Sequence, residues 1–265
     1  KQLKLLNKIN MKDINNYLML TRVKKCLMFT ITGKFNRDNI INAFKKLNIP
    51  NSDNKCKFNL VKNLSQCFTF SNKILYVKNS KTTSTNIIIS YPIDIKIGNK
   101  YGLYLTFLKN ILSNGLSSIL LKKLRLEMNL VYGVSIEYTT NLCGTILQIQ
   151  TSTDNNNVKI VIDEIFRLID YYIKQTIPKF KIEREKINYK LYLLNLCKTS
   201  PTVASIFYKH QYFWQLHKKN KKIYTFSQVA KNVMDLDEKK IKILMEKVFD
   251  KSKCLIAYTG KKKIY

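Results

Sequence analysis

A single stripe of apolar side chains constrains the fold more than any other feature of this sequence. Between residues 154 and 174 an apolar residue recurs at intervals of three or four, at Val158, Ile162, Ile165, Ile169 and Ile173. That spacing predicts a long amphipathic helix with one apolar face. Such a helix cannot bury its stripe by itself, so other elements of the chain must pack against it.

Short runs rich in β-branched and aromatic residues predict the sheet on which this helix packs. They cover residues 25–32, 67–70, 74–77, 86–91, 131–138, 145–151 and 254–258. Helical spacing covers residues 13–18, 38–49, 103–111, 117–128 and 178–197. Cap signals predict three more helix starts, at Ser200 before Pro201, Thr225 before Gln228 and Asp235 before Glu238. We therefore expect an α+β fold, with a mixed, largely antiparallel sheet and helices on one face.

The net charge of +30, from 47 Lys and Arg against 17 Asp and Glu, is weak evidence for a nucleic-acid partner. Lysine supplies 42 of the 47 cations and asparagine occurs 27 times, whereas alanine occurs four times, a bias typical of A/T-rich codons. Basic and aromatic residues alternate over residues 207–219, a pattern that can stack bases. The aromatic residues there fall at helical spacing, however, which favours core packing. A basic nucleic-acid-associated protein stays a second alternative, and we expect no specific nucleic-acid partner.

Neither a membrane span nor a secretory signal is predicted. The longest apolar run, residues 87–93, is far shorter than the ~20 residues of a spanning helix. The chain opens at Lys1 without an initiator methionine, so we expect it to begin inside a longer polypeptide. Its six cysteines lie far apart without a C-x-x-C pair, which favours an intracellular, reducing compartment. Cytoplasm, mitochondrion and virion are not distinguished.

Histidine chemistry is limited because the chain has only His210 and His217. The two are seven residues apart, and neither an H-E-x-x-H nor an H-x-x-E-H motif can be formed from them. We assign no metal ligand and no catalytic residue to this chain.

The most informative segment is residues 113–135, above all Gly115, Ser118, Leu120, Leu124, Arg125, Leu130, Tyr132 and Val134. These residues match in register a pattern in the C-terminal half of the pitrilysin/insulinase-type zinc metallopeptidases, a family that includes mitochondrial processing peptidase, and the segment therefore resembles that half. The chain departs from the family's pattern at Ile119, Leu121, Leu126, Asn129 and Gly133. Asn129 replaces a turn glycine, a tolerable change because asparagine readily adopts positive φ.

The start of the chain resembles the end of the same family's N-terminal half. Residues 9–17, a strand that closes on Gly33 and residues 35–40 follow the family's succession of helix start, strand and helix. A polar, irregular stretch over residues 51–63 is typical of a linker. We therefore interpret residues 1–50 as the tail of the N-terminal half and residues 51–265 as the C-terminal half.

The resemblance implies a clamshell of two similar α+β halves. The N-terminal half of such proteins binds zinc through H-x-x-E-H and a downstream Glu, and the C-terminal half grips substrate with an Arg/Tyr pair. The pair here would be Arg125 and Tyr132, and the turn residues Asn114, Gly115 and Asn129 would shape that corner. Guanidinium and phenol groups are donors that can fix a peptide carbonyl. By spacing alone, the two residues would be an ordinary surface arginine and a half-buried tyrosine.

The same resemblance implies that the zinc ligands lie before Lys1, so that zinc would be bound by a half absent from this chain. We expect the C-terminal, substrate-binding portion of a zinc metalloendopeptidase that cleaves peptides in an enclosed chamber and is not active by itself. Its partner would be the N-terminal zinc-binding half or a separate subunit, in a homo- or hetero-dimer. The first alternative is a catalytically inactive structural homologue, such as a complex core or virion subunit.

Overall fold

The computed structural model describes residues 6–21, 29–47, 73–93, 100–141, 144–199 and 224–264, with residues 27, 49, 201, 202, 204, 205 and 208 between them. Several predictions lie outside these residues: the linker at 51–63, the strand at 67–70, the Ser200 cap and both histidines. None of the described helices is long and apolar enough to span a bilayer.

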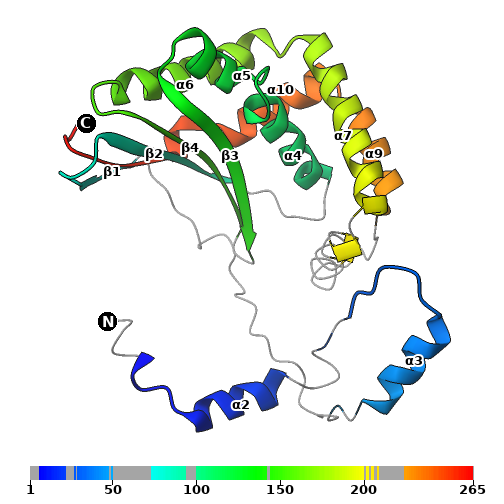
Figure 1. The fold of residues 1–265 in the computed structure, drawn as a ribbon. Coiled ribbons are helices and arrows are strands. Elements are labelled where there is room, and N and C mark those ends of the chain that lie inside the picture. The colour runs from blue at the N-terminus through cyan, green and yellow to red at the C-terminus, as the bar shows by residue number, and fades with distance from the viewer. Residues whose placement is uncertain are drawn as a thin grey trace.

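The described strands form one five-stranded sheet (Figure 1). Its strands are β1 (Lys73–Lys78), β2 (Ser84–Ile93), β3 (Val131–Asn141), β4 (Gly144–Asp154) and β5 (Leu255–Gly260). They are ordered β1-β5-β2-β4-β3, with β1 parallel to β5 and all other neighbours antiparallel. The predicted mixed, largely antiparallel sheet is confirmed, and among the described strands β3 lies at one edge.

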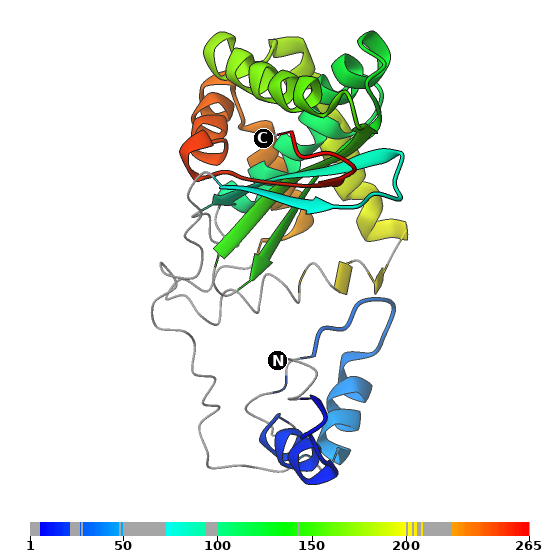
Figure 2. The same cartoon turned by 90° about the vertical axis from the view of Figure 1, so that its left-hand side faces the viewer.

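Helices lie along one side of this sheet (Figure 2). They are α4 (Lys100–Ser113), α5 (Ile119–Leu121), α6 (Val158–Gln175), α7 (Lys179–Thr199), α9 (Phe226–Met234) and α10 (Glu238–Val248). A π-helical turn, η3 (Lys122–Glu127), continues α5, and a 3-10 turn, η4 (Lys251–Lys253), precedes β5. The α+β class is therefore confirmed.

The core forms between the sheet and these helices because both present an apolar face. In β2 and β4 alternate residues are buried, among them Ile89, Leu147 and Ile149, which have no exposed surface. The predicted stripe of α6 is buried from Val158 to Ile169, whereas Ile173 at its end is partly exposed. Burial of this stripe against the sheet is what holds α6 in place.

One of the two predicted capping boxes is confirmed and the other is wrong. Thr225 and Gln228 exchange the two hydrogen bonds of a capping box at the start of α9. The cap of α10 is Asp237, whose carboxylate accepts from Lys240 N–H at 2.7 Å. Asp235 ends α9 instead, because its own N–H completes the last turn of that helix. Its backbone is still helical, at φ −79° and ψ −2°, whereas Asp237 has the extended backbone typical of an N-cap.

The N-terminal part contains α2 (Met11–Thr21) and α3 (Arg37–Lys46), as the sequence predicts. Asn36 caps α3 by accepting from two backbone N–H groups. The described residues of the strand expected over 25–32 have no regular secondary structure, so that strand is not formed there. A hydrogen bond from Ser205 Oγ to Thr30 O, at 3.1 Å, joins this segment to the C-terminal part.

Candidate functional site

The candidate site begins at the break between α4 and α5. Gly115 has φ +80°, which favours glycine, and Ser118 N–H donates to its carbonyl oxygen at 3.0 Å. The buried Ser113 hydroxyl accepts from Ile136 N–H of β3 at 3.1 Å. The end of α4 is thereby fixed to the edge strand, and the helix that carries Arg125 starts from this anchored turn.

A π-helical turn carries Arg125. In η3 the helix closes through a wider hydrogen bond, from Met128 N–H to Lys123 O at 3.0 Å. Asn129 ends the turn with φ +53°, so the replacement of a glycine by asparagine is accommodated as expected. Single π-helical turns within α-helices are rare, and those that occur often lie at functional sites.

A β-bulge directly after this turn carries Tyr132. The register of β3 on β4 shifts between Val131 and Val134, so that two residues of β3, Tyr132 and Gly133, lie opposite one residue of β4. A bulge of this kind bends the strand and redirects a side chain. Tyr132 is 84% exposed, although tyrosine in a sheet is usually half-buried.

Two buried threonines of β4 support the bulge. Thr151 Oγ1 donates to Gly133 O at 2.7 Å, and Thr153 Oγ1 donates to Leu130 O at 2.6 Å. Both threonines are less than 9% exposed. The carbonyl groups on either side of Tyr132 are therefore fixed by hydroxyls from the neighbouring strand, and the position of Tyr132 is set by packing inside the sheet.

The side chains of Arg125 and Tyr132, the pair implied by the family resemblance, lie in contact. Arg125 Cζ lies 4.9 Å from the centroid of the Tyr132 ring, within the range of a cation–π contact. Arg125 is half-buried, whereas Tyr132 is exposed. The contact orients the guanidinium without consuming its N–H groups, so the pair presents several donors to solvent at the edge of the sheet.

The three turn residues of the prediction occupy two different places. Asn129 lies between Arg125 and Tyr132, at the end of η3. Asn114 and Gly115 lie before α5, at the opposite end of the helical segment that carries Arg125. They lie where that segment begins, and the helical turns of the segment separate them from Arg125.

The described residues do not fit a zinc ion, because no group of three or more His, Cys, Asp and Glu side chains among them could hold a metal. Ligands for a zinc ion would therefore have to come from outside the described residues.

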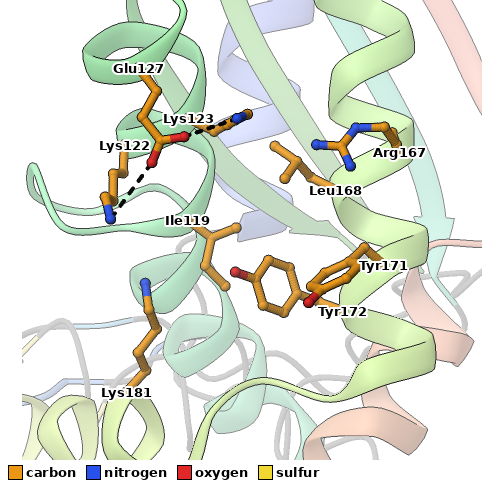
Figure 3. Close-up of a pocket in the computed structure, with 9 residues that line it drawn as sticks. All are labelled: Ile119, Lys122, Lys123, Glu127, Arg167, Leu168, Tyr171, Tyr172 and Lys181. Atoms are coloured by element: carbon orange, nitrogen blue, oxygen red, sulfur yellow. Dashed lines mark hydrogen bonds and ion pairs between the residues drawn. The ribbon is translucent and has the colours of Figure 1, made fainter.

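Sequence reasoning missed a cavity between α5–η3, α6 and α7 (Figure 3). Its walls include side chains far apart in the sequence, such as Lys122 and Lys181, and nothing in the local sequence pattern connects them. Only the packing of the three helices brings these side chains together.

Comparisons with known proteins identify the family. Residues 27–189, more than half of the chain, match the family described as the peptidase M16 inactive domain. No curated protein sequence matches the chain at a significant level. Among solved structures, a protease from Helicobacter pylori superposes with a TM-score of 0.76 and 16% identity, over 96% of this chain and 59% of that chain.

Two further structures have the same fold. The peptidase M16 inactive domain from Pseudomonas fluorescens has a TM-score of 0.62 and 16% identity, over 72% of this chain and 44% of that chain. The periplasmic protease PqqL from Escherichia coli has a TM-score of 0.63 and 8% identity, over 87% of this chain and 25% of that chain. The chain thus spans about half the length of the first two of these three structures, and less of the third. It belongs to the M16 peptidases, the pitrilysin/insulinase-type family that its sequence resembles, and corresponds to their inactive, C-terminal portion.

Proposed function

We propose that this chain is the substrate-binding portion of an M16 zinc metalloendopeptidase, and that Arg125 and Tyr132 grip the peptide. The observation that carries the proposal is the contact between the two side chains at 4.9 Å, on an exposed tyrosine. A solvent-exposed tyrosine, supported from below by two buried threonine hydroxyls, contributes little to core packing. A role in binding accounts for its position.

The chemistry of the pair suits a peptide carbonyl. The guanidinium of Arg125 offers a planar set of N–H donors, and the phenol of Tyr132 offers one O–H donor. Two donors that converge from a helix end and a strand can fix one carbonyl oxygen in direction as well as position. Because Arg125 stacks on the ring, its donors are already ordered before substrate arrives, which lowers the entropy lost on binding.

The zinc chemistry of the proposed enzyme belongs to another half or subunit. The described residues offer no zinc site, so this chain would complete the chamber and hold substrate against a zinc-bearing partner. A catalytically inactive structural homologue is the competing candidate, and the family's description as an inactive domain is compatible with it. Zinc ligands in the partner half decide between the two, because only an active peptidase requires them.

The test is peptide cleavage with the zinc-binding half supplied, in one polypeptide or as a separate subunit. Arg125→Ala and Tyr132→Phe should each lower kcat/KM roughly 10- to 100-fold, because each removes a donor to the substrate. Matched controls are Arg37→Ala on α3 and Tyr192→Phe on α7, which lie on other elements. Circular dichroism melting verifies that all four variants remain folded. Rates equal to those of the controls would remove both residues from the proposed site.

A further inference from the structure

A cavity of about 260 Å³ lies between α5–η3, α6 and α7, and neither Arg125 nor Tyr132 lines it (Figure 3). Four cationic side chains line it, Lys122, Lys123, Arg167 and Lys181, against the single carboxylate of Glu127. Cations that converge on one small cavity repel one another unless an anion lies between them. The ion pairs that the nearby carboxylates form show which of the four cations has no carboxylate partner.

Three of the cations already have carboxylate partners. Glu127 accepts from Lys123 at 2.9 Å and lies 3.6 Å from Lys122. The hydrogen bond from Lys123 lowers the pKa of Glu127, so this carboxylate is charged and shared between two lysines. Arg167 donates two hydrogen bonds, both of 2.6 Å, to the carboxylate of Glu164.

Lys181 is the cation without such a partner. No carboxylate of the described residues forms an ion pair with it, and its ammonium donates only a long hydrogen bond, 3.4 Å, to Ser117 O. Burial lowers the pKa of Lys181, and the positive charges of Lys122 and Arg184 lower it further. Arg184 itself donates to Ser117 Oγ at 3.0 Å. Lys181 and Arg184 therefore both approach the Ser117 corner, and neither forms an ion pair with a carboxylate of the described residues.

The remaining lining adds neutral donors and limits the size of a ligand. Tyr171 and Tyr172 extend from α6 toward the space between the helices, next to the apolar side chains of Ile119 and Leu168 (Figure 3). Burial raises the pKa of Tyr172, so its phenol stays protonated and can donate. The cavity is smaller than the roughly 300–1,000 Å³ of pockets for drug-sized ligands. A compact, multiply charged anion fits these properties better than an extended molecule.

We propose that this cavity binds a phosphate group, either as inorganic phosphate or as the phosphate of a small ester. A phosphate group carries about −1.5 to −2 charges at pH 7 and several acceptor oxygens. Its oxygens can therefore accept hydrogen bonds from Lys181, Lys122 and a tyrosine phenol at once, whereas a single carboxylate has only two oxygens for these donors. The site is separate from the Arg125–Tyr132 corner, and it does not depend on the proposed substrate role.

The test is isothermal titration of the full chain with inorganic phosphate, with glycerol 3-phosphate and with an N-acetylated glutamate peptide, each at fixed ionic strength. We expect saturable binding of one phosphate per chain. Lys181→Gln should weaken it on the order of tenfold, because it removes a hydrogen bond from a charged donor. The control is Lys179→Gln, the same change two residues earlier on α7, at an exposed position outside the cavity.

The relative affinities of the ligands show whether the site takes free phosphate or a phosphate ester. Tighter binding of glycerol 3-phosphate than of inorganic phosphate identifies an ester as the ligand, and the reverse order identifies the free ion. The proposal is overturned if phosphate binding does not saturate, if Lys179→Gln weakens it as much as Lys181→Gln, or if the glutamate peptide binds more tightly than both phosphates. Thermal melting of both variants verifies that a loss of binding is not a loss of folding.

Discussion

The substitution Thr151→Val removes one hydroxyl from beneath the bulge that carries Tyr132 and leaves the side-chain shape nearly unchanged. Thr151 is 8% exposed, and its Oγ1 donates to Gly133 O at 2.7 Å. In the variant a methyl group takes the place of the hydroxyl, so the carbonyl of Gly133 loses its donor from β4. No cavity of consequence is created, and the measured effect reports the hydrogen bond.

The magnitude follows from the burial of the two groups. Leaving a buried acceptor without its donor costs about 1–3 kcal/mol. Gly133 is partly exposed, so water replaces part of the bond, and we expect a loss near the lower limit, about 1 kcal/mol in the free energy of unfolding. A change of that size lowers Tm by about 2–4 °C in a domain of this length.

Urea unfolding followed by circular dichroism measures the difference, and amide hydrogen exchange locates it. Thr139→Val is the matched control, because Thr139 is exposed on β3, the strand that carries the bulge, and the same substitution there should change stability by less than about 0.5 kcal/mol. Exchange at Gly133 and Val134 should accelerate in Thr151→Val alone. Equal stabilities of the two variants with unchanged exchange would refute the claim that Thr151 holds the bulge.

Two further predictions concern the turn and a helix cap. Asn129→Ala should lower the free energy of unfolding by about 1 kcal/mol, because φ is +53°, whereas Asn129→Gly should not; urea unfolding of the pair checks this. Hydrogen bonds with Lys240 lower the pKa of Asp237, so its contribution to stability is complete above its unfolded pKa of about 3.9 and is lost as pH falls through the lowered value. Asp237→Asn, which retains a capping oxygen, should weaken that pH dependence in melting curves between pH 2 and pH 6; an unchanged dependence would exclude this carboxylate as its source.

The elements of the fold were predictable where a local pattern fixes them. The stripe of α6 depends on side-chain period, and the strands β2 and β4 on runs rich in β-branched residues; the structure confirms both. The capping box at Thr225 is likewise local. The cap at Asp235 was predicted wrongly because the motif there resembles a capping box, although Asp235 is needed to close α9 and Asp237 begins α10.

The candidate site was predictable only in part. A family pattern indicated Arg125 and Tyr132; the structure shows them in contact, and their role in binding substrate stays a prediction. The bulge that exposes Tyr132 depends on one extra residue in the pairing of β3 with β4, which no property of either strand alone reveals. The cavity at Lys181 depends on the packing of three helices and on how their carboxylates are already paired. The bulge and the cavity are tertiary features, and no periodic pattern in a single sequence predicts them.

A double-mutant cycle for peptide cleavage tests the central claim most directly, namely that Arg125 and Tyr132 hold substrate as one unit. With the zinc-binding half supplied, kcat/KM is measured for Arg125→Ala, for Tyr132→Ala and for the double variant. Because the guanidinium is ordered by the ring, 4.9 Å from its centroid, we predict that Arg125→Ala has little further effect once Tyr132 is removed. Additive losses, or none in either single variant, would contradict the account.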